Sequence, residues 1–517
     1  MSSPNALVQP LPLAHDKCYN RAMKSLFSRS RTFFSQPIAF GALLGGAALI
    51  VRSLFLTKAS VWHDEGYSAM IINYPPGDII ARTMHDVHPP LYYLLLSGWQ
   101  AIFGSGIISL RGFSVACGVA TVVLLYALLR RLFSSETIAK TGATLAAIGP
   151  FLVRYSEEMR MYSLAALIAV GATYAFVHAV QQKQQSWSWW IAYGALLAAG
   201  LYTQYFIILI VPAHLLYLWA LKGGDWHSAK QLIAHKGLWL GATTGIALFA
   251  PWVPAMFAQV TRVSGGFWIP PVDWFSIPNA LSSFITYDHR ITEWLGISFT
   301  IGLVWASLAL ARRKKTLRPA IWLLLGWIYI PMILVALLSL RNPVFMDRYF
   351  VFVTPALYAL IGVLYCSYTS RWKNWQRLVA GVGIVWLLLI GISVVGNSAT
   401  HQMGGAGALV NREYRPGDMI VSAELYTFFD FSYYNHTSQP VHLLSPEPFG
   451  QYGEWSLIHD KETELRVAKL SNINAPRVWL VGKTGERDYF GKDVPSSWRV
   501  VTEFRGGDTV VRLYETN

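Results

Sequence analysis

Trp62-His63-Asp64-Glu65-Gly66-Tyr67 places two adjacent carboxylates directly after the first long apolar segment of the chain. A second polar run, His85-Asp86-Val87-His88-Pro89-Pro90, follows shortly after it. Carboxylates beside a membrane are costly to hold there, so they commonly mark function. The competing interpretation is a solvated loop whose acids have no role, and position alone does not decide between the two.

The composition is that of a membrane protein. The 517 residues are 54% hydrophobic and 14% charged, which is too apolar for a soluble globular domain. The net charge of +14 could suggest nucleic-acid binding, but many basic residues lie in short loops between apolar segments, where they orient a chain in the bilayer. We therefore expect a polytopic α-helical membrane protein in contact with membrane lipids and without a nucleic-acid partner.

The apolar segments predict eleven membrane spans. We exclude Leu91–Phe103 from them, because this stretch would reach only ~20 Å as a helix, which is short for a ~30 Å hydrocarbon core. We expect an interfacial or re-entrant helix on the outer side there. Counting it as a span would place Arg312–Lys315 outside, against the positive-inside rule. The spans lie at about residues 37–56, 110–130, 138–155, 161–181, 187–203, 205–221, 237–257, 294–311, 318–340, 349–369 and 377–396.

The chain divides into three predicted parts: a basic cytoplasmic tail (1–36), a membrane domain (37–396) and an outer domain (397–517). An odd number of spans places the last part outside. Its short alternating segments predict a small α/β domain that folds independently and covers the mouth of the site. For its aromatic run, Tyr426–Phe431, we favour packing in a core over stacking on sugar. The strand-like segments are Met419–Ser422, Val478–Val481 and Thr509–Tyr514.

Four blocks together resemble the GT-C integral-membrane glycosyltransferases, in particular the family 39, protein-mannosyltransferase-like branch. The resemblance covers roughly residues 37–360. One block departs from it, because Tyr202-Thr203-Gln204-Tyr205 has Gln where many members have His. The four blocks are Trp62–Ala69, Asp86–Leu91, Tyr155–Tyr162, and Arg348-Tyr349 before a span.

The resemblance implies a GT-C-like fold with a large first outer loop. It also implies transfer of a sugar from a polyprenyl-phosphate-linked donor to a glycan, lipid or protein acceptor, usually with inversion. The expected location is the plasma membrane, the inner membrane in a bacterium, with the active site on the outer, periplasmic side.

Asp64 and Glu65 are the predicted catalytic pair. Asp64, the first acid of the family's pair, is the candidate general base for the acceptor hydroxyl. Glu65 would orient the sugar or an arginine, and two close carboxylates tend to split their pKa values. The alternative is a pair of acids that caps the start of a helix.

Arg160 is the candidate ligand of the donor phosphate, because a guanidinium matches phosphate oxygens and stays charged at low dielectric. Arg348 is a second candidate, although either arginine could instead snorkel at the interface. Glu158 would pair with Arg160 or form a surface salt bridge. Tyr162 and Tyr349 complete the predicted donor and phosphate site.

The predicted substrate loop contains His63, Asp86, His88 and Gln204. No cofactor is expected to be required, but a divalent cation is possible at His85, Asp86 and His88, because imidazole and carboxylate suit several metals. Their spacing is not a recognised ligand pattern. A structural role is the alternative, since His88 precedes two prolines that suit the start of a helix.

Two other classes of protein are compatible with parts of the sequence. A transporter or flippase of a lipid-linked sugar could use the same carboxylates as a proton relay. Transporters usually contain repeated halves and ionisable residues near the midplane, whereas here the acids gather at the outer edge and no halves repeat. An outer-face sensor would leave the Asp-Glu and His-Pro-Pro blocks without a role.

Overall fold

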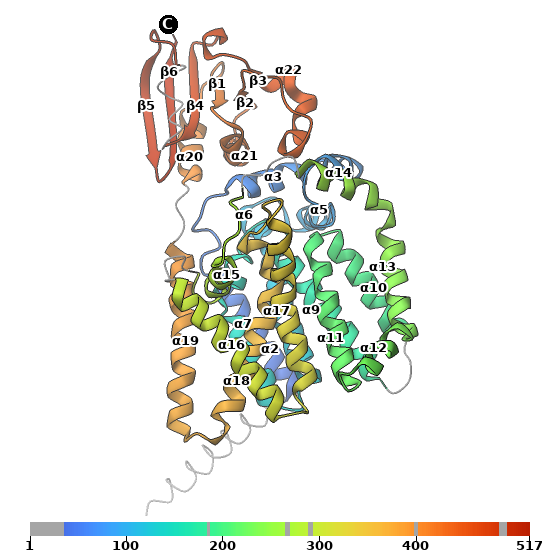
Figure 1. Cartoon of the computed structure of the whole chain (residues 1–517). Helices are drawn as coiled ribbons and strands as arrows, with labels where there is room; N and C mark the ends of the chain where they lie inside the picture. The colour runs from blue at the N-terminus through green and yellow to red at the C-terminus, as the bar shows by residue number, and fades with distance from the viewer. Residues whose placement is uncertain are drawn as a thin grey trace, which may run out of the picture.

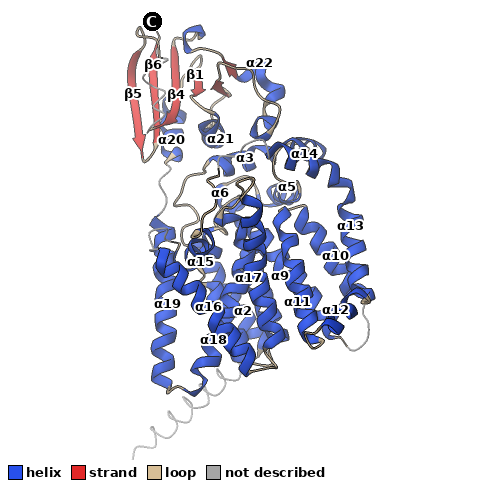
Figure 2. Cartoon of the chain, in the orientation of Figure 1, coloured by secondary structure: helices blue, strands red, loops and turns tan. Residues whose placement is uncertain are grey.

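The structure is a computed structural model that describes residues 36–182, 187–263, 269–287, 293–397, 402–484 and 494–516. A bundle of helices makes up most of the molecule (Figure 1), and the described strands all lie in a smaller domain at one end of the bundle (Figure 2). This arrangement confirms the predicted fold class. The predicted basic tail, residues 1–36, lies outside the described residues except for its last position.

Seven helices in these ranges are long and apolar enough to cross a membrane. Each overlaps one of the predicted spans. They are α6 (Ile107–Leu132), α9 (Tyr162–Gln181), the stretch of α13, η2 and α14 (Lys236–Phe249, Ala250–Trp252, Val253–Val263), α16 (Glu293–Arg313), α17 (Arg318–Ser339), the stretch of η3, α18 and η4 (Asp347–Val353, Thr354–Tyr368, Thr369–Arg371) and α19 (Asn374–Asn397).

The other four predicted spans are shorter or interrupted helices, so the count of eleven crossings stays a prediction. The interruption between α7 and α8 falls at Pro150, which lacks the N–H that a continuous helix needs. The preceding Gly149 packs so closely on Tyr358 that a Cβ would lie 2.3 Å from that ring. The four segments are α2 (Pro37–Ser53), α7 with α8 (Glu136–Ala147, Pro150–Arg154), α10 (Trp187–Leu201), and η1 with α11 (Tyr205–Ile210, Val211–Leu221). The short helices α12 (Trp226–Ile233) and α15 (Ser276–Thr286) lie in the connections.

The first loop forms a layer of helices across the end of the bundle. α3 (His63–Ile71) and α5 (Leu91–Phe103) lie between the bundle and the strand-containing domain (Figure 1). α4 (Pro76–His85) joins them in sequence and packs against α14. The bounds of α5 are those of the short apolar run, and α5 lies across the bundle instead of along it (Figure 1). Its position at the outer membrane interface stays a prediction.

The C-terminal domain has a six-stranded sheet in the order β3-β2-β1-β4-β6-β5. The first four strands in this order run parallel, and β6 and β5 are antiparallel to their neighbours. All three segments predicted as strands are strands. The elements are α20 (Met403–Glu413), β1 (Met419–Ser422), α21 (Leu425–Tyr434), β2 (Val441–Leu444), η5 (Gly453–Leu457), η6 (His459–Lys461), α22 (Glu462–Leu465), β3 (Arg466–Val467), η7 (Leu470–Asn472), β4 (Arg477–Lys483), β5 (Arg499–Gly506) and β6 (Thr509–Glu515).

Helix α21 of this domain packs directly on α3 of the first loop. At Gly66 the two backbones approach so closely that a Cβ would lie 2.5 Å from the carbonyl carbon and oxygen of Phe429. The next residue, Tyr67, places its ring edge against Phe429, with the ring centroids 5.6 Å apart. The backbone N–H of Val61 donates to the Tyr434 hydroxyl at 2.7 Å. The C-terminal domain therefore lies on the helix that carries Asp64 and Glu65.

The aromatic run Tyr426–Phe431 is mostly part of this packing. Phe428, Phe429 and Phe431 are buried, whereas Tyr426 is exposed. These side chains fill a core instead of offering a platform for sugar, as predicted. That core is shared with the first loop, and independent folding of the domain stays a prediction.

We expect Gly66→Ala to weaken the contact between α21 and α3, because the added methyl group has no room against the Phe429 backbone. Overpacking of this kind costs about 1–3 kcal/mol. Hydrogen exchange of the amides of α21 in the full-length protein measures the loss directly. The matched control is Gly77→Ala in α4, where an added Cβ meets nothing within 4 Å. Equal protection of α21 in both variants would contradict the prediction.

Candidate active site

Asp64 lies in the first turn of α3, between two arginines that come from distant parts of the chain. Its Oδ2 is 3.3 Å from Nη1 of Arg348 and 3.7 Å from Nε of Arg160. Burial alone would raise the pKa of Asp64, but the positive charges of Arg160 and Arg348 outweigh it and hold this pKa below its usual value. Asp64 is therefore an ionised carboxylate beside two cations.

Glu65 points to a different arginine, because successive helical residues are rotated by about 100°. Nε and Nη2 of Arg111 donate to its two carboxylate oxygens at 2.8 and 2.6 Å, and the backbone N–H of Met159 donates to Oε1 at 2.9 Å. The pair is buried. Glu65 thus orients an arginine, which is one of its two predicted roles. Asp64 and Glu65 thus do not face each other as the predicted pair of carboxylates. Each is instead paired with arginines of its own.

Arg160 is buried immediately before α9, where it faces α3 and α5. Its Nη1 donates to the Tyr93 hydroxyl at 3.1 Å and, at 3.4 Å, to the backbone oxygen of Asp64 and the hydroxyl of Ser68. Its Nε has no hydrogen-bond partner among the described residues. The burial rules out a snorkelling arginine. The site therefore holds a fixed cation with one N–H left to donate.

Arg348 and Tyr162 complete the group around Asp64. The Arg348 guanidinium lies 5.5 Å from the centre of the Trp62 ring and 6.0 Å from that of Tyr349. Tyr162 is fully buried at the start of α9. It lies close enough to Arg348 and Arg160 to interact electrostatically with both. In the described part of the chain, its hydroxyl has no hydrogen-bond partner. The group thus offers several unused or displaceable donors around one carboxylate.

The predicted pairing of Glu158 with Arg160 is wrong. Glu158 instead meets Arg154, whose Nη2 lies 2.5 Å from Oε1. The two residues are four apart, the spacing at which side chains meet on one side of a helical turn. Burial raises the pKa of Glu158 although the charge of Arg154 opposes it. Arg160 is consequently free of this carboxylate and turns toward Asp64.

The second polar block brings two of its three titratable residues toward the site. Burial raises the pKa of Asp86 to about 6. Burial and the positive charge of Arg160 lower the pKa of His88 to about 3, so this imidazole is neutral. His85 is exposed. The prolines end the loop, and the next N–H, of Leu91, donates to the backbone of Tyr202 at 3.0 Å.

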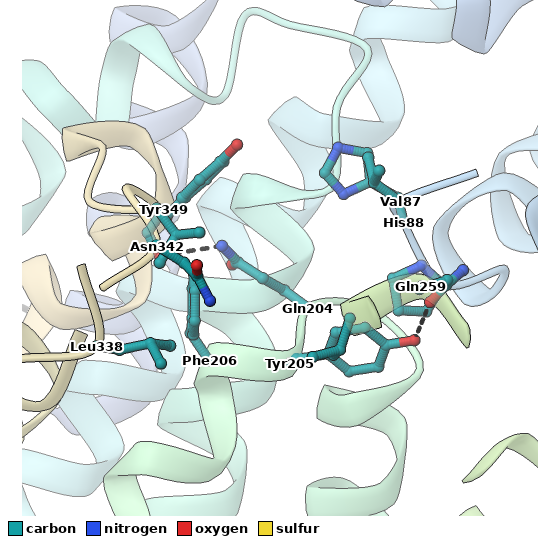
Figure 3. Close-up of a pocket in the computed structure, with 12 residues that line it drawn as sticks. Val87, His88, Gln204, Tyr205, Phe206, Gln259, Leu338, Asn342 and Tyr349 are labelled. Carbon is teal, nitrogen blue, oxygen red and sulfur yellow. Dashed lines mark hydrogen bonds between the residues drawn. The ribbon is translucent and has the colours of Figure 1, made fainter. Parts of the chain in front are cut away.

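An apolar pocket of about 210 Å³ adjoins His88 and Tyr349 (Figure 3). Gln204, which stands where many family members have His, donates through Nε2 to the backbone oxygen of Tyr349 at 3.0 Å. This bond fixes the segment that carries Arg348. Two lining residues, Val260 and Leu338, are 55% and 50% exposed, so the pocket opens to the outer surface of the bundle.

The same segment also borders a polar cavity of about 250 Å³. Arg348 lines the polar cavity, whereas the adjacent Tyr349 lines the apolar pocket. The ion-pair partner of Asp64 therefore borders one space, and its neighbour in sequence borders the other. The cavity is lined by Lys58, Trp62, Arg111, Arg154, Glu157 and Arg348, among other residues.

The group with metal-ligand spacing is His63, Asp64 and Glu454, whose ligand atoms lie within 4.8 Å of one another. Within the described residues, the predicted candidates His85, Asp86 and His88 do not form such a group. A cation at the first group would replace the contact of 2.5 Å between His63 and Glu454, whereas both ion pairs of Asp64 with the arginines use its Oδ2. These three residues therefore permit a divalent cation.

His63, predicted as part of the substrate loop, connects the first loop to the C-terminal domain. Its Nε2 lies 2.5 Å from Oε1 of Glu454, and its Nδ1 lies 3.4 Å from the backbone oxygen of Tyr426. Burial alone would lower the pKa of His63, but the hydrogen bond and charge of Glu454 raise it above its usual value. His63 thus links the first loop to the C-terminal domain through both ring nitrogens.

Three residues of the site were not singled out from the sequence. Arg111 lies inside a predicted span, and a charged residue in an apolar segment is a signal of function or of buried pairing. Arg154 had a weaker signal, its four-residue spacing from Glu158. Glu454 had none, because its partner is 391 positions away along the chain.

Comparisons with known proteins agree with this fold. The model of the dolichyl-phosphate-mannose-protein mannosyltransferase family matches residues 87–254, and no curated protein matches the chain in sequence. ArnT from Cupriavidus metallidurans bound to undecaprenyl phosphate has a TM-score of 0.62 at 14% identity, over 91% of this chain and 97% of ArnT. An oligosaccharyltransferase from Archaeoglobus fulgidus, tethered to an acceptor peptide, has a TM-score of 0.51 at 12% identity, over 87% of this chain and 70% of that one.

These likenesses define the class of the protein. It is an integral-membrane protein with the GT-C fold, as the four sequence blocks predicted. Within that class, its resemblance to the protein mannosyltransferases is confirmed over the stretch that begins in the His-Pro-Pro block.

We expect the contact between the two domains to depend on pH through His63. Because the folded-state pKa is raised, the stabilisation is complete below the ordinary value of about 6.5 and is lost as the pH rises through the raised pKa. Hydrogen exchange of α21, compared at pH 6 and pH 8.5, measures this loss.

Glu454→Gln should remove most of this pH dependence, because the amide no longer favours the imidazolium. Glu447→Gln, at an exposed position of the same domain, should leave it unchanged. The same pH dependence in all three proteins would refute the role of the pair.

Proposed function

We propose that the protein transfers a sugar from a polyprenyl-phosphate-linked donor to an acceptor at the outer face of the membrane. The observation that carries this proposal is that two guanidinium groups hold Asp64, and that one of them, Arg348, lines a polar cavity while the adjacent Tyr349 lines an apolar pocket. A lipid-linked sugar phosphate has the same three parts, an apolar tail, a phosphate and a polar sugar. ArnT, which shares the fold, was solved with undecaprenyl phosphate bound.

The donor phosphate would bind to Arg160 and Arg348. Both guanidinium groups already face one carboxylate oxygen, so they converge on a single point of negative charge. Arg160 retains an unused N–H, and the Tyr162 hydroxyl has no partner within the described ranges. Charge-assisted hydrogen bonds of this kind are the strong ones in phosphate recognition.

The polyprenyl tail would occupy the apolar pocket and leave through its open side. The apolar residues that line the pocket include Val87, Phe206, Val260, Leu338 and Val344. Because Val260 and Leu338 are also exposed on the bundle surface, a lipid could enter sideways from the bilayer.

Asp64 would act as the general base, and the sugar would be transferred with inversion. The acceptor hydroxyl gives its proton to Asp64 as its oxygen forms a bond with the anomeric carbon. The bond from that carbon to the phosphate oxygen breaks, and the polyprenyl phosphate leaves with the electron pair. Arg160 and Arg348 stabilise the charge that grows on the leaving phosphate. Glu65 and Arg111 take no part in these steps and hold the first turn of α3 in place.

Binding of the donor would also strengthen the base. In the unliganded site, Arg160 and Arg348 lower the pKa of Asp64. A phosphate that shares these cations adds a negative charge beside the carboxylate, which raises its pKa. Asp64 would thus become a better proton acceptor only when the donor is present.

The acceptor would reach the site from the side of the C-terminal domain, which lies on α3 next to Asp64. A glycan, a lipid or a protein could supply the hydroxyl group. The bias of basic residues toward the opposite loops favours an outer position for this side, which would be the periplasm in a bacterial inner membrane.

Asp64→Asn should lower turnover by roughly 10²–10⁴-fold, the usual contribution of a positioned general base. The variant removes the charge that Arg160 and Arg348 share and should be less stable, so its melting temperature is measured as well. It should still bind undecaprenyl phosphate, because the phosphate supplies negative charge to the two arginines. Transfer from lipid-linked sugars by the full-length protein in nanodiscs measures the effect. Asp78→Asn, exposed in α4, is the matched control. Turnover within twofold of the wild type would exclude Asp64 as the base.

Arg160→Ala should weaken binding of the lipid donor or abolish activity, because it removes a buried phosphate ligand. Arg160→Lys should restore only part of the loss, since an ammonium group lacks the planar fork of donors. Arg412→Ala, at an exposed position, controls for a general effect of charge. The KM for the donor and the melting temperature separate binding from folding. Full activity of the wild type with a soluble nucleotide sugar in place of the lipid would count against the proposed donor.

A further inference from the structure

Arg52 is a fully buried arginine near the end of α2, a segment that is predicted to span the membrane. Its guanidinium donates to the backbone oxygens of the last two residues of α7, Ala146 at 3.3 Å and Ala147 at 2.8 Å. The carboxyl end of a helix carries a partial negative charge, which suits a cation. A charged side chain inside a span is costly and commonly marks function. The end of α7 accounts for one side of this guanidinium.

The other contact of the Arg52 guanidinium is with Ser156, in the turn between α8 and α9. Its Nε donates to the Ser156 hydroxyl at 3.2 Å. That hydroxyl gives its own proton to the backbone oxygen of Leu152 at 2.6 Å, so a lone pair faces the arginine. Gly118 of α6 lies against this contact, where an added Cβ would stand 2.2 Å from the Ser156 hydroxyl and 2.8 Å from Nε of Arg52. The contact is therefore closely packed as well as hydrogen-bonded.

The turn that contains Ser156 also carries Arg160. Residues 155–161 lie between α8 and α9 in turns and bends instead of a continuous helix, so contacts with other elements set the position of this segment. Toward the first loop, the backbone N–H of Met159 donates to Glu65 at 2.9 Å. Toward the bundle, Ser156 is held by Arg52. Arg160 follows Met159 directly, and its position depends on both contacts.

We propose that Arg52 is a positioning residue for the donor-phosphate site, because through Ser156 it fixes the turn that presents Arg160. The inference rests on the proposed function and adds to it a residue that touches neither the donor nor the acceptor. An arginine suits this role because its planar fork reaches the end of α7 and the Ser156 hydroxyl at the same time. The ammonium group of a lysine is a single point of charge on a flexible stem.

The test measures the preference of the full-length protein in nanodiscs for undecaprenyl phosphate over undecaprenol, which has the same tail without the phosphate. Ser156→Ala removes the hydroxyl that Arg52 holds and leaves the contacts of Arg52 with α7 in place. Ser307→Ala is the matched control, because Ser307 is also fully buried and donates to the carbonyl group four residues earlier, at 2.6 Å. Melting temperatures report the stability of each variant.

We expect Ser156→Ala to lower the preference for the phosphate by about 2–10-fold, the range for one lost hydrogen bond, and Ser307→Ala to leave it unchanged. Arg52→Lys should lower the preference at least as much as Ser156→Ala. Ser156→Ala combined with Arg160→Ala should show the preference of Arg160→Ala alone, because residues that act through one another are not additive. Ser156→Ala decides the test if Arg52→Lys does not fold.

An unchanged preference in Ser156→Ala, at any melting temperature, would overturn the inference, because Arg52 would then serve the fold alone. A loss in Ser156→Ala that adds in full to the loss in Arg160→Ala would overturn it as well. Both results leave the proposed function intact. A wild-type protein that binds undecaprenol as tightly as undecaprenyl phosphate would overturn the proposed donor, and the inference with it.

Discussion

The ion pairs of Asp64 with Arg160 and Arg348 are the interaction on which the outer end of the molecule depends. A carboxylate taken out of water without a partner is strongly destabilising, and so is each guanidinium. These three side chains come from α3, from the turn before α9 and from η3. Their mutual neutralisation therefore requires the first loop to lie on the ends of the bundle helices. Because both arginines share this one carboxylate, removing Asp64 would take an ion-pair partner from each of them.

Because of helical geometry, four successive residues of α3 contact three different parts of the molecule. Asp64 meets the two arginines, Glu65 meets Arg111, and Gly66 and Tyr67 meet α21 of the C-terminal domain. Successive side chains point about 100° apart, so adjacent residues in the sequence face different parts of the molecule. The C-terminal domain consequently cannot shift on α3 without disturbing the helix that positions Asp64. Through this contact, the C-terminal domain can affect the position of Asp64, although none of its own residues takes part in the proposed reaction.

Sequence patterns predicted those features of the fold that depend on residues close together in the chain. The bounds of α5, the strands β1, β4 and β6, and the placement of the apolar helices follow from hydrophobic runs and short alternations. The family blocks located Asp64, Arg160 and Arg348. Pairings could not be predicted in the same way, because a charge selects its partner by three-dimensional distance. Glu158 therefore met Arg154 instead of Arg160, and Glu454 reached His63 from a separate domain.

The charges around Asp64 also bear on the proposed reaction. The ion pairs of Glu65 with Arg111 and of Glu158 with Arg154 are each neutral, so the carboxylates that act on the charge of Arg160 are Asp64 and Asp86. When the proposed reaction moves a proton to Asp64 and releases a phosphate monoester from a phosphodiester, the lost charge on the carboxylate reappears on the leaving group. The two arginines then face the same total negative charge before and after transfer, so a buried site can hold both states without a large change in electrostatic energy.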